Sequence, residues 1–122
     1  RTALEYARDR AHVGLITNGG RPTQTQKLRT LGIEDAFDVR VFTEPSAGIA
    51  PKPSAAPFER ALTELAVTPD AAIHVGDSLH ADIAGANAMG LDSAWLDLGR
   101  DEPGEHVPTY ELASLETLET IV

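Results

Sequence analysis

Short apolar and β-branched runs alternate along the chain with stretches in which apolar residues recur every three or four positions. Runs of the first kind predict strands, and spacings of the second kind predict amphipathic helices. We expect four strands, at Val13–Thr17, Val39–Thr43, Ala72–Gly76 and Ala94–Leu98. Strands that alternate with helices are typical of an α/β fold with a parallel sheet, and this is the fold class that the pattern predicts.

The predicted helices lie between and around these strands. We expect them at Thr2–Ala11, Pro22–Leu31, Pro57–Leu65 and Leu79–Met89. Glycines follow the second and the fourth of these segments, where they suit a helix C-terminus. A short terminal helix is also expected, because one face would carry Leu115, Leu118, Ile121 and Val122. No repeat, low-complexity tract or linker interrupts the chain, which favours one domain over residues 1–122.

The composition narrows the class of protein further. The chain carries nineteen Asp and Glu against ten Lys and Arg, a net charge of −9, whereas non-specific nucleic-acid binding needs a basic face. It has no cysteine, which excludes disulfides, thiolate metal sites and thiol catalysis. No apolar run approaches the roughly 20 residues that cross a membrane. We therefore expect an acidic, soluble, cytoplasmic protein with no nucleic-acid or membrane partner.

Candidate chemistry lies in the loops after the strands, because ligands of parallel α/β sheets bind beyond the carboxyl ends of the strands. After the first strand comes Thr17-Asn18-Gly19-Gly20. A hydroxyl group beside backbone N–H groups freed by flexible glycines suits phosphate oxygens. The alternative is a plain turn, since Asn-Gly is a strong turn dipeptide.

The loop after the second strand contains Lys52 between Pro51 and Pro53, in a chain with only two lysines. The prolines fix the backbone on both sides of a cation, and a fixed ammonium group can neutralise a phosphoryl group and its attacking carboxylate. The alternative is a solvated loop lysine.

The third strand leads into Gly76-Asp77-Ser78 and, five residues after the first acid, Asp82. A carboxylate at the end of a strand is a hard oxygen ligand that suits Mg²⁺. Asp82 is placed to hold the lysine or a metal-bound water. In the alternative, Asp77 or Ser78 is an N-cap and Asp82 interacts with the helix dipole.

A hydroxyl loop, a lysine loop and an acidic loop in this order resemble phosphatases of the haloacid dehalogenase-like (HAD) superfamily. The segments "GLITNGG", "KPSAAPFERAL", "VGDSLHADIAGANAMG" and "YELASLETL" are similar to its successive blocks. The resemblance implies a Rossmann-like core and assigns phosphate binding to Thr17, Asn18 and Gly19. It also implies that Lys52 stabilises charge, that Asp77 ligates Mg²⁺ and that Asp82 is the supporting acidic residue of the catalytic site.

The resemblance also identifies a missing part. HAD enzymes attack phosphorus with the first aspartate of an Asp-x-Asp-x-(Thr/Val) motif on their first strand, and no Asp-x-Asp occurs in this sequence. Asp9 lies in a helical, arginine-flanked stretch and does not replace it. We therefore expect a fragment or truncated product that lacks the central strand and the cap. Such a chain would be inactive by itself, because covalent phosphoryl transfer needs the nucleophile.

Three functions remain open at this stage. The resemblance favours a Mg²⁺-dependent hydrolase of a small phosphorylated metabolite that acts through an aspartyl-phosphate. A haloacid dehalogenase would use the same nucleophile without Mg²⁺, and a non-catalytic phosphate-binding or interaction module would use none. A missing central strand also predicts self-association or complementation by the absent segment.

Overall fold

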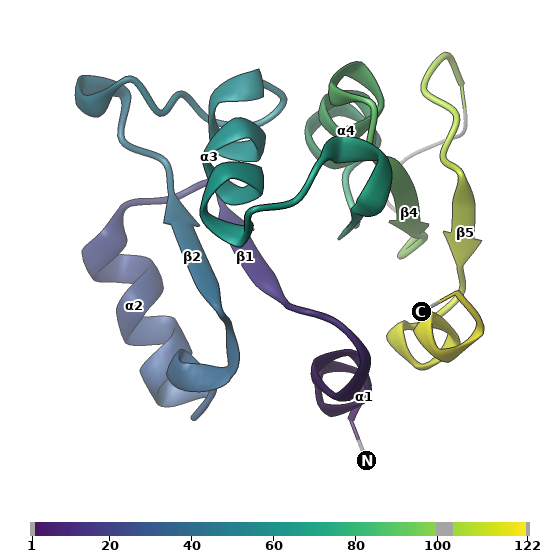
Figure 1. The fold of residues 1–122 in the computed structure, drawn as a ribbon, viewed down its shortest axis with the longest axis horizontal. Coiled ribbons are helices and arrows are strands. Elements are labelled where there is room, and N and C mark those ends of the chain that lie inside the picture. The colour runs from purple at the N-terminus through teal and green to yellow at the C-terminus, as the bar shows by residue number, and fades with distance from the viewer. Residues whose placement is uncertain (1, 100–103, 122) are drawn as a thin grey trace.

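The computed structural model describes residues 2–99 and 104–121 of the chain (Figure 1). Within these residues, five short strands form two parallel sheets. The first sheet pairs β1 (Gly14–Thr17) with β2 (Val39–Phe42). The second has the order β3-β4-β5, from Ile73–Gly76 through Asp92–Leu96 to Tyr110–Leu112. Parallel strands with intervening helices confirm the predicted α/β, Rossmann-like fold class.

The count of four strands was too low, because β5 was not predicted. This strand has only three residues, so its hydrophobic alternation is too brief to distinguish it from a loop. Its position depends on contacts made elsewhere in the chain. Leu112 is buried, and side chain-to-backbone hydrogen bonds join Ser93 on β4 to Thr109 just before β5 in both directions.

The two sheets are not hydrogen-bonded to each other through any described strand. Strand β1 has β2 on one side, β3 has β4 on one side, and each leaves its other edge without a strand neighbour. This arrangement agrees with the expected absence of a central strand, and it excludes closure of the two halves by direct pairing of β1 with β3. Unpaired edges of this kind are templates for strand addition.

The α-helices lie close to their predicted positions, whereas three short 3₁₀ helices were not predicted: η1 (Glu34–Ala36), η2 (Pro45–Ala47) and η3 (Pro69–Ala71). Helix α1 (Ala3–Arg10) begins at a capping box between Thr2 and Glu5, and α3 (Ala55–Leu65) begins at Ser54. Helix α2 covers Arg21–Thr30 with a proline in its first turn. Among the described residues, no helix has the length and apolar character required to span a membrane.

Two predicted helices differ from the α-helical expectation. Leu79–Ile83 forms a π-helical turn (η4) in which the N–H of Ile83 donates to the carbonyl of Ser78, and only Ala84–Met89 (α4) is α-helical. The terminal segment Leu115–Thr120 is a 3₁₀ helix (η5) with Leu118 buried and Leu115 about half exposed. Val122, which we assigned to its face, lies outside the described residues.

The helices connect the two sheets. Helix α3 packs against β1 and β2 and also against α4, so it bridges the two halves at the centre of Figure 1. Helix α1 precedes β1 in the chain but packs against η5 and the second sheet. There, Ala3 and Ala7 contact the buried cluster of Ala94, Leu112 and Leu118. The tyrosine hydroxyl of Tyr6 donates to the carbonyl of Glu119 in η5. The beginning and end of the described chain therefore lie side by side (Figure 1).

Candidate functional site

A buried ion pair joins the loop after β2 to the turn after β3. The ammonium nitrogen Nζ of Lys52 lies 2.7 Å from Oδ1 of Asp82, and these side chains are only 11% and 7% exposed. The same Nζ donates to the backbone carbonyl of Ile16 on β1, at 3.3 Å. Lys52 thus contacts groups from both sides of the gap between the two sheets. It is not the solvated lysine of the alternative interpretation.

Asp82 has further partners on both carboxylate oxygens. Nε2 of His74 lies 2.9 Å from Oδ1, and the N–H of Ser78 donates to Oδ2 at 3.1 Å. Burial by itself raises the pKa of the Asp82 carboxyl group. The hydrogen bonds from His74 and Lys52 and the positive charge of Lys52 outweigh burial, and they hold this pKa well below its ordinary value. Asp82 is therefore ionised at neutral pH.

Gly76 is a glycine because the Asp82 carboxylate lies directly against its backbone. A Cβ atom at position 76 would come within 2.2 Å of Cγ of Asp82, which is closer than real Cβ contacts occur. The backbone of residues 76–78 therefore wraps around the carboxylate, and Ser78 also caps the following turn by accepting a hydrogen bond from the N–H of Ala81. The expected N-cap role of Ser78 is observed together with the ion pair, so the two interpretations coexist.

Asn18 holds the Lys52 loop in place through two reciprocal hydrogen bonds. The backbone N–H of Lys52 donates to Oδ1 of Asn18 at 2.8 Å, and Nδ2 of Asn18 donates to the carbonyl of Lys52 at 3.2 Å. The loops after β1 and β2 are thus joined at the residue that carries the cation. This reciprocal pair holds the loop in addition to the two flanking prolines.

The other residues of the loop after β1 have partners inside the chain. The hydroxyl group of Thr17 donates to Oε1 of Gln24, and the N–H of Gly19 donates to the hydroxyl oxygen of Thr43 at 3.1 Å. Gly19 lies close to the Gln24 side chain, whose Nε2 would be 2.4 Å from an added Cβ, so Gln24 would have to move to accept one. Neither Gly19 nor Gly20 has a positive φ in this structure, so steric room explains the first glycine better than backbone flexibility does.

Asp77 directly follows β3, at the position the sequence indicated. Its carbonyl oxygen accepts a hydrogen bond from the indole Nε1 of the buried Trp95, which fixes the backbone at this point. In residues 2–99 and 104–121, no group of three His, Asp or Glu side chains is arranged to hold a metal ion.

The structure brings the loops after β1, β2 and β3 together around one buried cation. Of the predicted site residues, Asn18, Lys52 and Asp82 are linked by hydrogen bonds, while Thr17 bonds to Gln24 of α2 and Gly19 to Thr43 just after β2. Sequence reasoning did not find the parts of His74, Gln24 and Thr43. The available signal for His74 was a single polar residue inside an otherwise apolar strand.

Comparisons with known proteins agree with this architecture. A family model described as haloacid dehalogenase-like hydrolase matches residues 1–90. The chain is 37% identical to the pyrimidine 5′-nucleotidase of Escherichia coli strain K12, over 98% of the chain and 53% of the nucleotidase. It is 33% identical to the glyceraldehyde 3-phosphate phosphatase of Pyrococcus furiosus, over 98% of the chain and 52% of that phosphatase.

A solved structure gives the same result. A HAD-hydrolase of Bacillus subtilis, described as bound to magnesium, superposes with a TM-score of 0.88 and 27% identity, over 98% of this chain and 52% of the other. The chain spans about half the length of the curated relatives it matches. Sequence and fold agree along nearly the whole chain, and we conclude that it belongs to the haloacid dehalogenase-like hydrolases.

Proposed function

We propose that this chain forms the phosphate-binding and charge-stabilising half of a Mg²⁺-dependent phosphate-monoester hydrolase that acts through an aspartyl-phosphate. The observation that carries the proposal is the buried Lys52–Asp82 ion pair, tied to the backbone of β1 through Ile16. A buried ammonium group at the meeting point of three strand-end loops is a fixed positive charge in a place of reduced dielectric. Such a charge stabilises an anionic phosphoryl group far better than a solvated lysine does.

Each residue has a distinct part in this proposal. Lys52 neutralises the phosphoryl oxygens, and Asp82 keeps the ammonium group of Lys52 oriented. Asn18 holds the Lys52 backbone, as the reciprocal hydrogen bonds indicate. The hydroxyl group of Thr17 and the N–H of Gly19 bind phosphate oxygens, for which they exchange their present bonds to Gln24 and Thr43. The substrate is a small phosphorylated metabolite.

Asp77 is the residue we propose as a magnesium ligand. Asp82 is already engaged on both oxygens by Lys52, His74 and Ser78, so it supports Lys52 and does not ligate the metal directly. One protein carboxylate fits Mg²⁺, which usually keeps several waters and is held by one or two carboxylates together with substrate phosphate. When bound there, Mg²⁺ would neutralise the phosphate and polarise it for attack.

The nucleophile is proposed to come from a segment outside these 122 residues. No Asp-x-Asp occurs in the sequence, and the adjacent edges of β1 and β3 offer a place for one further strand beside Lys52. A strand inserted there would end near the ammonium group that is meant to stabilise its charge. Complementation by such a strand is thus part of the same proposal.

The experiment that tests this function is a chimera, in which this chain is joined to the portion of the Escherichia coli nucleotidase that it does not span. We expect Mg²⁺-dependent hydrolysis of a generic aryl phosphate by the chimera and none by the 122-residue chain. The Asp77→Asn substitution should reduce turnover sharply and weaken the magnesium dependence. Loss of a covalent nucleophile costs several orders of magnitude in rate, so the two proteins are easily told apart.

Two results would reject the proposal in different ways. Dehalogenation of a 2-haloacid by the chimera without Mg²⁺, and without phosphatase activity, would favour the dehalogenase alternative. A folded chimera that binds inorganic phosphate but hydrolyses neither class of substrate, at any magnesium concentration, would favour the non-catalytic module.

A further inference from the structure

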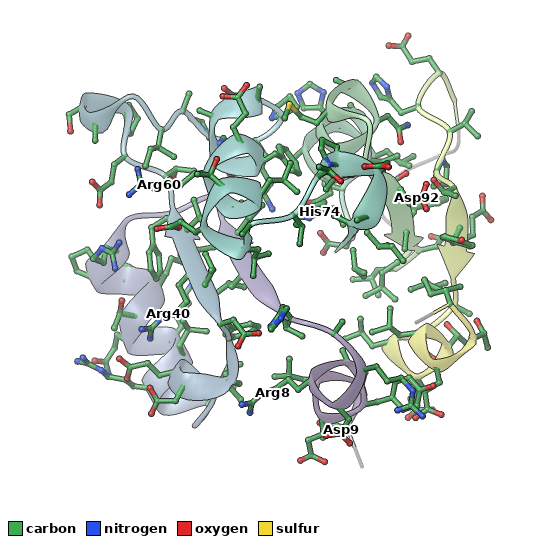
Figure 2. The ribbon with its side chains drawn as sticks, in the orientation of Figure 1. Arg8, Asp9, Arg40, Arg60, His74 and Asp92 are labelled. Carbon is green, nitrogen blue, oxygen red and sulfur yellow. The ribbon has the colours of Figure 1, made fainter. Side chains whose placement is uncertain are left out.

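His74 is a largely buried titratable side chain to which the proposed reaction gives no part. It lies in the middle of β3, its side chain is 12% exposed, and Figure 2 shows it near the centre of the molecule, beside α3. Its Nε2 atom lies 2.9 Å from Oδ1 of Asp82, the same oxygen that accepts the hydrogen bond from Lys52. One carboxylate oxygen therefore couples the histidine to the lysine.

The imidazole ring is fixed from its other side by a packed aromatic residue. The ring of Phe58 in α3 meets the His74 ring edge-on, with centroids 4.9 Å apart and an angle of 82°. Phe58 is fully buried, and α4 approaches it so closely that a Cβ at Gly85 would come within 2.5 Å of its ring. The imidazole ring of His74 thus has little freedom to rotate, because the packing of α3 on α4 holds the Phe58 ring against it.

The hydrogen-bond chemistry determines which nitrogen of His74 carries a proton. The Asp82 carboxyl group is ionised, since its pKa lies well below the ordinary value, and an ionised carboxylate only accepts. A stable 2.9 Å contact therefore requires a proton on Nε2 of His74. With that donor in place, the carboxylate has Lys52 and His74 on one oxygen and the Ser78 N–H on the other.

We propose that His74 is a positioning residue, which fixes the Asp82 carboxylate and through it the Lys52 ammonium group. This inference deepens the proposed function and rests on it only for the claim that Lys52 meets a phosphoryl group. Without the His74 donor, the Asp82 side chain is held by two groups instead of three. The carboxylate then rotates more freely, and Lys52 loses its fixed place beside Ile16 of β1.

The two lysines of the chain provide a direct measurement. Lys27 lies exposed on α2 and serves as the internal standard for Lys52. Competitive labelling with an amine-specific reagent gives the ratio of their rates in the 122-residue chain without any substrate. We expect Lys52 to react much more slowly than Lys27. The His74→Phe substitution, which keeps a ring but removes the donor, should raise the Lys52 rate roughly tenfold, the effect of losing one charge-assisted hydrogen bond.

Two variants separate positioning from general loosening of the fold. His74→Gln keeps a donor at a similar distance and should restore most of the protection of Lys52. Leu112→Ala removes a buried side chain far from the ion pair, in the cluster with Ala94 and Leu118, and should leave the ratio unchanged. The proposal is overturned if Leu112→Ala raises the Lys52 rate as much as His74→Phe does, or if Lys52 and Lys27 react equally in the unsubstituted chain.

A spectroscopic measurement tests the same idea without any substitution. Long-range ¹⁵N–¹H correlations of the imidazole rings should show His74 protonated on Nε2 at neutral pH. A neutral ring protonated on Nδ1 alone would place two acceptors, Nε2 of His74 and Oδ1 of Asp82, against each other. That result would show the inference to be wrong. Neither measurement requires magnesium or turnover. If they contradict the positioning role of His74, the hydrolase proposal still stands. If the chimera is inactive, the positioning role of His74 is unaffected.

Discussion

Asp82 is a nearly buried carboxylate whose charge depends on its neighbours. Lys52 and His74 both contact one of its oxygens. Burial raises the pKa of Asp82, but the hydrogen bonds and charges of these two residues lower it by more. A group with a lowered folded pKa contributes stability that is full above its ordinary pKa, about 4 for aspartate, and is lost as the pH falls through the folded value. The ion pair therefore links stability to pH on the acidic side.

We expect the Asp82→Asn substitution to reduce the free energy of unfolding at pH 7 by roughly 3 kcal/mol, because the buried Lys52 charge loses its counter-ion. The difference in unfolding free energy between the two proteins should shrink as the pH is lowered from about 5 towards 3. In this range the stability that the ionised Asp82 carboxylate contributes to the unsubstituted protein begins to be lost. Urea unfolding of the chimera across this range measures both effects. A difference that stays constant with pH would show that the Asp82 charge has no such part.

The sequence predicted the cation and its carboxylate, but it did not predict how closely they are held. Lys52 was identified by its two flanking prolines and Asp82 by its spacing from Asp77, which are local features. The hydrogen bonds of His74, of Gln24 to Thr17 and of Thr43 to Gly19 join segments whose approach depends on the tertiary fold. No local pattern specifies such contacts, so they were found only in the structure.

At the scale of elements, the turn between β3 and α4 supplies the carboxylate of the site. Residues 79–83 form a π-helical turn instead of the first turn of one α-helix, and Asp82 lies in it with its carboxylate against the backbone of Gly76. π-Helical turns inside helices are frequent at functional sites. Periodicity cannot separate them from α-helix, because both place apolar residues such as Leu79 and Ile83 on a buried face.

The close approach at Gly76 makes this element sensitive to one methyl group. Gly76→Ala places a Cβ only 2.2 Å from Cγ of Asp82, so the carboxylate must move and its contact with Lys52 is disturbed. We expect turnover by the chimera to fall roughly 100-fold, the cost of misplacing a catalytic group by about 1 Å. Gly104→Ala is the matched control, since its methyl group would meet nothing within 4 Å. Equal turnover in the two variants would contradict this account of the turn.

At the scale of the whole molecule, the described strands leave a gap between β1 and β3. Helix α3 and the Lys52 side chain cross this gap, and α1 reaches back to the C-terminal cluster, so the halves are connected by side chains and helices and not by a continuous sheet. The family resemblance predicted a missing central strand. The register within each sheet and the bridging by Lys52 required the structure.

Because no described strand pairs with these edges, the amide groups that face the gap should exchange quickly with solvent. We expect fast hydrogen exchange at the gap-facing amides of β1 and β3 in the 122-residue chain, and slower exchange at the amides that pair β4 with β5. In the chimera the inner edges should become protected, and the unfolding transition should sharpen. Strong protection of both inner edges in the isolated monomeric chain would contradict the gap.

The central claim is that the Lys52 ammonium group stabilises the phosphoryl group of the substrate. Its most direct test is the value of kcat/KM of the chimera after single substitutions of this chain's two lysines, Lys52→Met and Lys27→Met. We predict that the first lowers kcat/KM by roughly 100- to 1,000-fold, the usual cost of removing one preorganised charge-stabilising donor. The second, on the exposed surface of α2, should leave it unchanged. A folded Lys52→Met enzyme with unchanged kcat/KM would contradict the claim.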